Sequence, residues 1–411
     1  DEFSLFREGL LTVDDLPTNP ARLAAFGLTG QVEWDKLYGD FASGTARKAS
    51  LVNMEHHFLP LTQKAVTEAV DWMQNSLMAG QSKMDPSSHV YWWKVLLGLV
   101  SLLAAIFMLI PLTNLFLATE FFKPVSQSVP SGYVAPKKKW WTFAVINFLI
   151  GGITYPIFTQ WSALSDKYQA IFPLLRLQVG NGVFVWLLVN AVISAILFTI
   201  WYRQSKKTGE VQLKDLGVVS TEEEKKQGVL GKTILLAVVM FLCLYLVQAL
   251  FQLIFKQEIR FVWPFMRQFS NFTRVWLFLL YLIPTIAFWL INGGLFLFGQ
   301  MHLKEEASPS KTQWVWWAKA CFAFLTGLLI VWMIQYLPWY LANAGPGFEL
   351  LKLPQFSALW PLMLQVYIPE FLILIWILVW FYRRTGRIYL GAFMVSSLMI
   401  WFLAAGSVVA K

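Results

Sequence analysis

Charged residues are scarce in this chain, and their scarcity indicates its class. Only 14% of the 411 residues are Asp, Glu, Lys or Arg, whereas ordinary soluble domains contain about 25%. Cysteine is nearly absent too: Cys243 and Cys321 both lie within apolar runs, which excludes a disulfide framework. Hydrophobic residues make up 57% of the chain. This balance predicts a predominantly helical, polytopic membrane protein with a modest polar portion.

Several chemical signatures are also missing. The 411 residues contain no Gly-x-Ser-x-Gly turn, no phosphate-binding glycine-rich loop and no haem or iron–sulfur spacing. The net charge of +9 comes mainly from Lys and Arg between apolar runs, where such residues orient a membrane protein and contact anionic headgroups. We therefore expect membrane lipids as partners, no nucleic-acid partner and no cofactor.

Long apolar runs dominate the chain after residue 90. Each has about 20 residues or more, enough to cross a bilayer core about 30 Å thick. The runs cover 91–117, 140–163, 180–202, 233–255, 274–300, 314–341, 357–382 and 387–409. We predict about eight transmembrane helices in a membrane domain of residues 91–411, preceded by a polar linker at 81–90.

The loops between these runs differ in positive charge. Lys and Arg are more than twice as frequent in the first, third, fifth and seventh loops as in the other three. The positive-inside rule places the richer set in the cytoplasm. Since the number of spans is even, the N-terminal polar region and the C-terminus are both expected outside the cytoplasm.

Residues 1–80 differ from the rest of the chain in being polar and mixed in composition. The stretch TNPARLAAFG predicts a short helix capped by Thr18 or Asn19, with Pro20 in its first turn and Gly27 at its end. Residues 1–80 contain too few apolar positions to form, on their own, a sheet covered by helices on both faces. This region is therefore expected to be the last portion of a larger α/β domain.

Two of the four histidines lie together in this polar region. Ala46–Met54 is predicted to be a strand, and Thr62 is predicted to cap an amphipathic helix that follows it. His56 and His57 occupy the loop between these two elements. A solvated pair on a surface loop is the simplest interpretation. A zinc site is not expected, because adjacent histidines rarely reach one ion and no third ligand has a known spacing.

Four stretches give the chain a resemblance to a known family. They are DEFS at the start, LYGDFASGTARK, EHHF with its following VDWMQ helix, and EIRFVWPFMRQF ahead of a run containing LINGG. In these stretches the chain resembles the C-terminal part of a bacterial membrane-integrated α/β-hydrolase family, in which an extracytoplasmic α/β-hydrolase domain precedes a multi-span membrane domain. The resemblance implies that residues 1–80 end such a domain and that the protein lies in the bacterial cytoplasmic (inner) membrane.

The resemblance also implies roles for individual residues. In the α/β-hydrolase fold the catalytic histidine follows the acid and the nucleophile in chain order, in the loop between the last strand and the last helix. His57 matches this histidine, with His56 as the alternative. Asp1 matches the orienting acid, with Asp14 or Asp15 as fallbacks. The implied activity is hydrolysis or acyl transfer on an ester, thioester or amide of a small-molecule or lipid substrate. This activity needs a serine nucleophile upstream of these residues. Without such a serine, the region is a hydrolase-like remnant.

A carboxylate within an apolar run gives a second candidate. YIPEFLI places Glu370 about midway along the seventh run, directly after Pro369. An ionisable residue there is a functional candidate by default, although a structural Glu bonded to a neighbouring helix fits the sequence equally well. Two alternatives to a hydrolase therefore stay open: a transporter or lipid-handling protein with a hydrolase-like lid, and a structural subunit of a membrane complex or oligomer.

Overall fold

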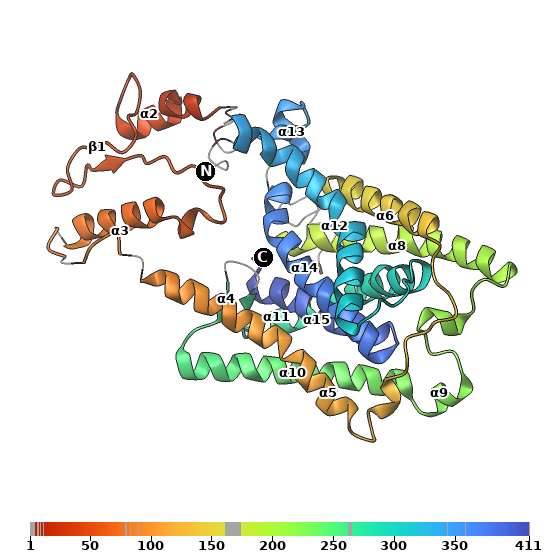
Figure 1. Cartoon of the computed structure of the whole chain (residues 1–411). Coiled ribbons are helices and arrows are strands. Elements are labelled where there is room, and N and C mark those ends of the chain that lie inside the picture. Colours follow the sequence, from red (N-terminus) through yellow and green to blue (C-terminus); the bar gives the residue numbers. More distant parts are fainter. Residues whose placement is uncertain are drawn as a thin grey trace. The chain divides into compact units, whose positions relative to one another are not determined.

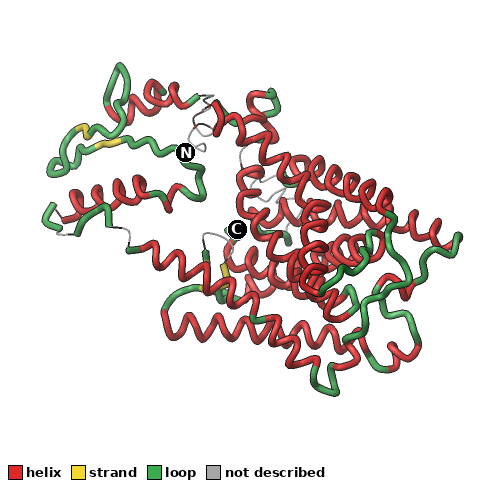
Figure 2. Tube along the Cα trace, viewed as in Figure 1, coloured by secondary structure: helices red, strands yellow, loops and turns green. Residues whose placement is uncertain are grey.

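A computed structural model describes most of the chain as helix (Figures 1 and 2). The described residues are 5, 8, 10, 12–78, 80–82, 84–88, 90–160, 174–261, 265–342, 344–357 and 359–410. The chain forms two compact units. The first contains Asp1–Leu97 with Val331–Gln365, and the second contains Gly98–Ile330 with Val366–Lys411. The predicted division at residues 81–90 stays a prediction.

Eight helical segments among the described residues are long and apolar enough to cross a membrane. In order they are α4 (Tyr91–Phe107) with α5 (Leu109–Leu117), α6 (Lys137–Phe158), α8 (Gln178–Lys207), α10 (Val229–Phe255), α11 (Phe272–Phe288) with the π-helix η5 (Trp289–Gln300), α12 (Pro309–Ala342), α14 (Leu359–Thr385) and α15 (Tyr389–Gly406). Each coincides with one predicted run, although residues 161–163 of the second run lie outside the described residues. The prediction of a predominantly helical, multi-pass membrane protein is confirmed.

Short elements complete both units. In the first unit they are η1 (Val13–Thr18), α2 (Pro20–Phe26), β1 (Leu37–Tyr38), β2 (Arg47–Lys48), η2 (Leu59–Leu61), α3 (Gln63–Met78), α13 (Gly347–Leu350) and η6 (Pro354–Phe356). In the second unit they are η3 (Lys123–Val125), η4 (Leu213–Leu216), α9 (Glu222–Lys226), β3 (Ile259–Arg260) and β4 (Phe265–Met266).

The second unit is a helix bundle organised around α15. This helix packs against α10, α11 and η5, while α8 packs against α6, α11 and η5. Every side chain of α15 from Met394 to Ala405 is buried. A helix that is apolar on all sides belongs in the interior of a large protein or bundle, and α15 holds that position here.

Two glycines allow α6 and α12 to pack closely within this unit. A Cβ atom added at Gly152 of α6 would lie 2.9 Å from the Cα of Gly327 in α12, and one added at Gly327 would collide with the Phe148 carbonyl oxygen. Asn147 Nδ2 adds a hydrogen bond of 2.8 Å to the Ala323 carbonyl across the same contact. Small residues and interhelical hydrogen bonds are the usual means of holding helices together where lipid removes the hydrophobic driving force.

Local chemistry accounts for α2 in the first unit. Asn19 Oδ1 accepts hydrogen bonds from Ala21 N at 2.9 Å and Arg22 N at 3.3 Å, so the cap is Asn19 rather than Thr18. Gly27 ends the helix with φ at +68°, in the left-handed region that favours glycine. The predicted cap, first-turn proline and terminal glycine are confirmed.

The strand predicted over Ala46–Met54 is wrong in length. Only Arg47–Lys48 is a strand, and it pairs antiparallel with Leu37–Tyr38. The chain turns immediately afterwards, because Met54 N bonds to the Val52 carbonyl at 2.9 Å instead of to a neighbouring strand. Within the described residues of the polar region this two-residue ladder is the only sheet, so the sheet expected of an α/β-hydrolase domain is not seen there.

The amphipathic helix is present as α3, but its apolar face is only partly covered. Thr62 Oγ1 accepts a hydrogen bond from Ala65 N at 3.4 Å, as expected of the predicted cap. Farther along, Met73, Leu77 and Met78 are all more than half exposed. The predicted helix is therefore confirmed. The apolar side chains at its C-terminal end, however, are not buried as they usually are in an amphipathic helix.

A charged contact joins two interhelical loops of the second unit. Glu224 of α9 accepts hydrogen bonds from Thr221 N at 2.8 Å and Ser220 N at 2.9 Å, and its Oε1 lies 2.6 Å from Nη1 of the nearly buried Arg387. Partial burial alone would raise the pKa of Glu224, but the two backbone amides and the Arg387 guanidinium outweigh it and lower the pKa to about 2.

Replacing the packing glycine tests the α6–α12 contact. Gly152→Ala should lower the free energy of unfolding by about 1–3 kcal/mol, the usual cost of overpacking, as measured by thermal or denaturant unfolding in detergent. The neighbouring Gly151→Ala is the matched control, because no atom lies within 4 Å of the added Cβ. Equal stability of the two variants would contradict close packing at Gly152.

The Glu224–Arg387 pair should make stability depend on pH. A carboxyl group whose folded-state pKa is lowered contributes stability above its unfolded pKa, and that contribution is lost as pH falls from about 4.5 towards 2. Glu224→Gln should therefore destabilise the protein at pH 7, on the order of 2 kcal/mol, and less at pH 3. Glu222→Gln, which removes the same charge from an exposed site of α9, should change little at either pH. Thermal unfolding at both pH values measures the difference, and an equal loss at both would exclude an ionised Glu224 as its source.

Candidate functional site

The loop that carries the histidine pair is closed on itself by Glu55. The Glu55 side chain is 2% exposed, and its two carboxylate oxygens accept hydrogen bonds from His57 N at 2.9 Å and Phe58 N at 2.6 Å. A buried carboxylate is costly unless such donors satisfy it. The bonded turn leads into η2, which explains why the chain leaves the extended conformation here instead of continuing as a strand.

The His57 ring is held at one of its two nitrogens. Nδ1 lies 3.3 Å from Oε1 of Gln365, a residue of α14 that belongs to the same unit, and 3.6 Å from Oε2 of Glu55. The first distance corresponds to a long hydrogen bond, whereas the second exceeds hydrogen-bond length and places a negative charge beside the ring. The His57 side chain keeps 19% of its surface exposed.

This contact determines what the ring can do chemically. With the Gln365 carboxamide oxygen as acceptor, Nδ1 of His57 carries the proton, and Nε2 of the neutral ring is then a proton acceptor. The arrangement therefore has the properties required of a general base.

The other histidine has a different environment. His56 is exposed, and its ring meets the His57 ring edge-on with centroids 5.9 Å apart. The Gln365 carboxamide and the Glu55 carboxylate both lie beside Nδ1 of His57.

Of the acids expected to orient the histidine, Asp1 is outside the described residues. Asp14 and Asp15 are in η1, where both are exposed and Asp15 accepts a hydrogen bond of 2.6 Å from the Thr12 hydroxyl. Among the described residues, the carboxylate found beside the His57 ring is Glu55.

Sequence reasoning missed Glu55 and the role of Gln365. Glu55 stands directly before the pair in EHHF, so its adjacency was a usable signal. Gln365 is 308 positions from His57, and no local pattern predicts such a contact. These two residues add a carboxylate and a carboxamide to the candidate site around the histidine pair.

Glu370 belongs to the second unit and forms a separate candidate. It is 3% exposed within α14, and the aromatic side chain of Tyr367, one turn earlier, is 1% exposed. Its burial agrees with its position midway along a span, where a carboxylate is expensive and commonly functional.

Metal-binding side chains are not clustered in the described part of the chain. No group of three or more His, Cys, Asp or Glu side chains among these residues is arranged to hold an ion. Cys243 and Cys321, both in membrane helices, are free. The chemistry available at His57 is therefore that of an imidazole, a carboxylate and a carboxamide.

Known proteins provide no further assignment. Comparison of the chain with protein-family models, with curated proteins and with solved structures finds no match. The site is accordingly interpreted from its own geometry.

Proposed function

We propose that these residues are part of a membrane-anchored, extracytoplasmic serine hydrolase or acyltransferase in which His57 is the general base. The observation that carries the proposal is the His57 imidazole, which is partly exposed and has Nδ1 held by Gln365 beside the buried Glu55 carboxylate. An oriented imidazole with one free nitrogen is the central requirement of nucleophile activation. The substrate class is an ester, thioester or amide of a small molecule or of a lipid, including those of the cell envelope.

The proposed chemistry follows from the two nitrogens of the ring. Nε2 of His57 removes the proton from a serine hydroxyl as the hydroxyl attacks the acyl carbon, and it returns that proton to the leaving group. Gln365 fixes the tautomer, and Glu55 stabilises the imidazolium formed in between. Asp1, which the family resemblance matches to the acid, is the alternative to Glu55 in that role.

The proposal requires parts that the described residues do not supply. The serine must come from outside these 411 residues, because no Gly-x-Ser-x-Gly turn occurs among them. The exposed apolar side chains Met73, Leu77 and Met78 on α3 support a missing neighbour, since one face of such a helix normally packs on a sheet or another helix. The remainder of an α/β domain is the neighbour that fits the proposal.

Burial of Glu370 supports a second candidate function. A transporter or lipid-handling protein would use such a carboxylate to bind a cation, a proton or a polar group within the membrane. The polar region would then act as a lid, and no acyl chemistry would take place at His57.

Covalent labelling tests the hydrolase proposal. A fluorophosphonate probe applied to membranes containing the natural full-length protein should label one serine, located by peptide mapping. His57→Ala should reduce the labelling rate by about 100-fold or more, the usual contribution of a general base, while His56→Ala should leave it nearly unchanged. Gln365→Leu should lower it about tenfold through loss of one hydrogen bond to the ring. Labelling that persists in His57→Ala, or a protein that no probe labels, would reject the proposal.

The second candidate has its own measurement. Glu370→Gln should abolish substrate-dependent proton or cation flux in proteoliposomes. The isosteric amide keeps the volume of the side chain and removes only its charge. Flux that is unchanged in this variant would remove Glu370 from any transport mechanism.

A further inference from the structure

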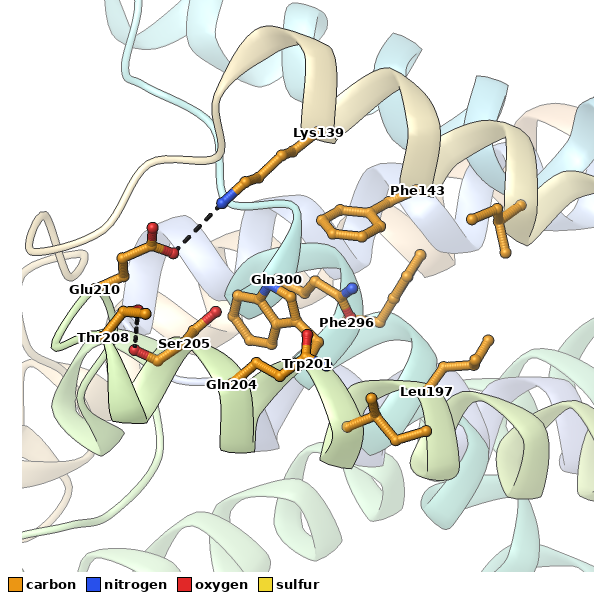
Figure 3. A pocket seen from close by; sticks show the side chains of 12 residues that line it. Lys139, Phe143, Leu197, Trp201, Gln204, Ser205, Thr208, Glu210, Phe296 and Gln300 are labelled. Atoms are coloured by element: carbon orange, nitrogen blue, oxygen red, sulfur yellow. Dashed lines mark hydrogen bonds and ion pairs between the residues drawn. The ribbon is translucent and has the colours of Figure 1, made fainter.

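A cavity of about 460 Å³ lies within the second unit, between α6, α8 and η5 (Figure 3). Its volume is in the range of small-molecule binding sites, about 300–1,000 Å³. Neither the histidine loop nor Glu370 contributes to its lining. It is therefore independent of the function proposed above.

The cavity lining separates into a polar and an apolar part. Lys139, from the first turn of the second span, and Glu210, just after the third span, are at the polar end. Leu197 and Ile200, two to three turns before the end of α8, are at the apolar end and are 39% and 51% exposed on the surface of the bundle. The polar end of the cavity lies at the end of a span, and its apolar end opens beside apolar helix surface. This arrangement suits an amphiphilic ligand at the edge of a bilayer, with its polar group at the first end and its apolar part at the second.

Gln300, one of the lining residues, carries a buried acceptor. It is 3% exposed, and its Oε1 has no hydrogen-bond partner among the described residues. Leaving a buried acceptor unsatisfied is costly, so a ligand that reaches Oε1 and donates a hydrogen bond to it gains affinity. Gln300 ends the π-helix η5, which also contributes Phe296 to the lining; such helices are rare and frequently found at functional sites.

A loosely held ion pair lies at the polar end. Lys139 Nζ is 3.4 Å from Glu210 Oε2, and about half of each side chain is exposed (Figure 3). Exposed pairs of this kind contribute little to stability. A ligand that carries both charges can therefore replace the pair at little cost, with an anion on Lys139 and a cation on Glu210.

These features select one class of lipid. We propose that the cavity binds a glycerophospholipid whose head group carries a primary ammonium, as in phosphatidylethanolamine. The phosphate pairs with Lys139, and the ammonium pairs with Glu210 and donates an N–H to Gln300 Oε1. A choline head group has the same charges but no N–H donor, and a glycerol head group has donors but no positive charge. The acyl chains leave along Leu197 and Ile200 into the bilayer.

Lipid retention measures this preference. The full-length protein is reconstituted in nanodiscs with equal amounts of phosphatidylethanolamine, phosphatidylcholine and phosphatidylglycerol, extracted mildly, and examined by native mass spectrometry. Phosphatidylethanolamine should be retained over phosphatidylcholine by about fivefold or more, the ratio that one hydrogen bond of about 1 kcal/mol produces. Gln300→Leu should reduce this ratio towards one, whereas Glu210→Gln should reduce the retention of both ammonium lipids relative to phosphatidylglycerol. Equal retention of the two lipids by the unaltered protein would overturn the proposal.

A matched pair of substitutions on α8 separates occupancy of the cavity from general lipid adhesion. Ile200→Trp fills the apolar end, while Ile196→Trp adds the same side chain one turn away at a position that is 56% exposed and does not line the cavity. Only Ile200→Trp should abolish retention. If both variants retain the lipid, the lipid is held elsewhere and the proposal fails. Fluorophosphonate labelling is unaffected in either case, so this outcome is distinct from that of the hydrolase test.

Discussion

The absence of water from the core of a bilayer is the constraint on which most of this structure depends. Every backbone N–H and C=O in that region must find a partner within the protein, and a helix satisfies all of them within one segment. The eight long helices are the consequence. The same constraint applies to side chains, because an amide or hydroxyl in a span must also be bonded to a neighbour or bear the cost of burial.

The second unit shows how these polar side chains are used. Ser194 Oγ bonds to Asn292 Oδ1 at 2.6 Å between α8 and η5, and Asn190 Nδ2 bonds to Thr154 Oγ1 at 3.0 Å between α8 and α6. In both cases the polar group joins adjacent helices. Some buried polar atoms stay unmatched: Nδ2 of Asn292 and Oε1 of Gln300 have no hydrogen-bond partner among the described residues. Of these two residues, Gln300 is the one that lines the cavity between α6, α8 and η5.

Features that depend on local or strongly periodic patterns could be predicted from the sequence. The spans follow from apolar runs, and α2 follows from Asn19, Pro20 and Gly27 acting on their own backbone. The length of the strand predicted over Ala46–Met54 could not be judged in this way, because β-propensity without a partner strand does not produce a ladder. Only Arg47–Lys48 finds such a partner, in Leu37–Tyr38. The contact of His57 with Gln365 was equally out of reach, since it joins segments that only the tertiary fold brings together.

The His57 contact also changes how the polar region relates to the membrane helices of its own unit. If the histidine were a solvated loop residue, its ring would not need a partner on a span. Instead, a glutamine of α14 fixes the nitrogen that faces Glu55. Rotation of that helix or displacement of the loop would break a hydrogen bond and free the ring to change tautomer. In the proposed hydrolase, Gln365 would position the imidazole, and an amide at this position does so without adding charge to the span.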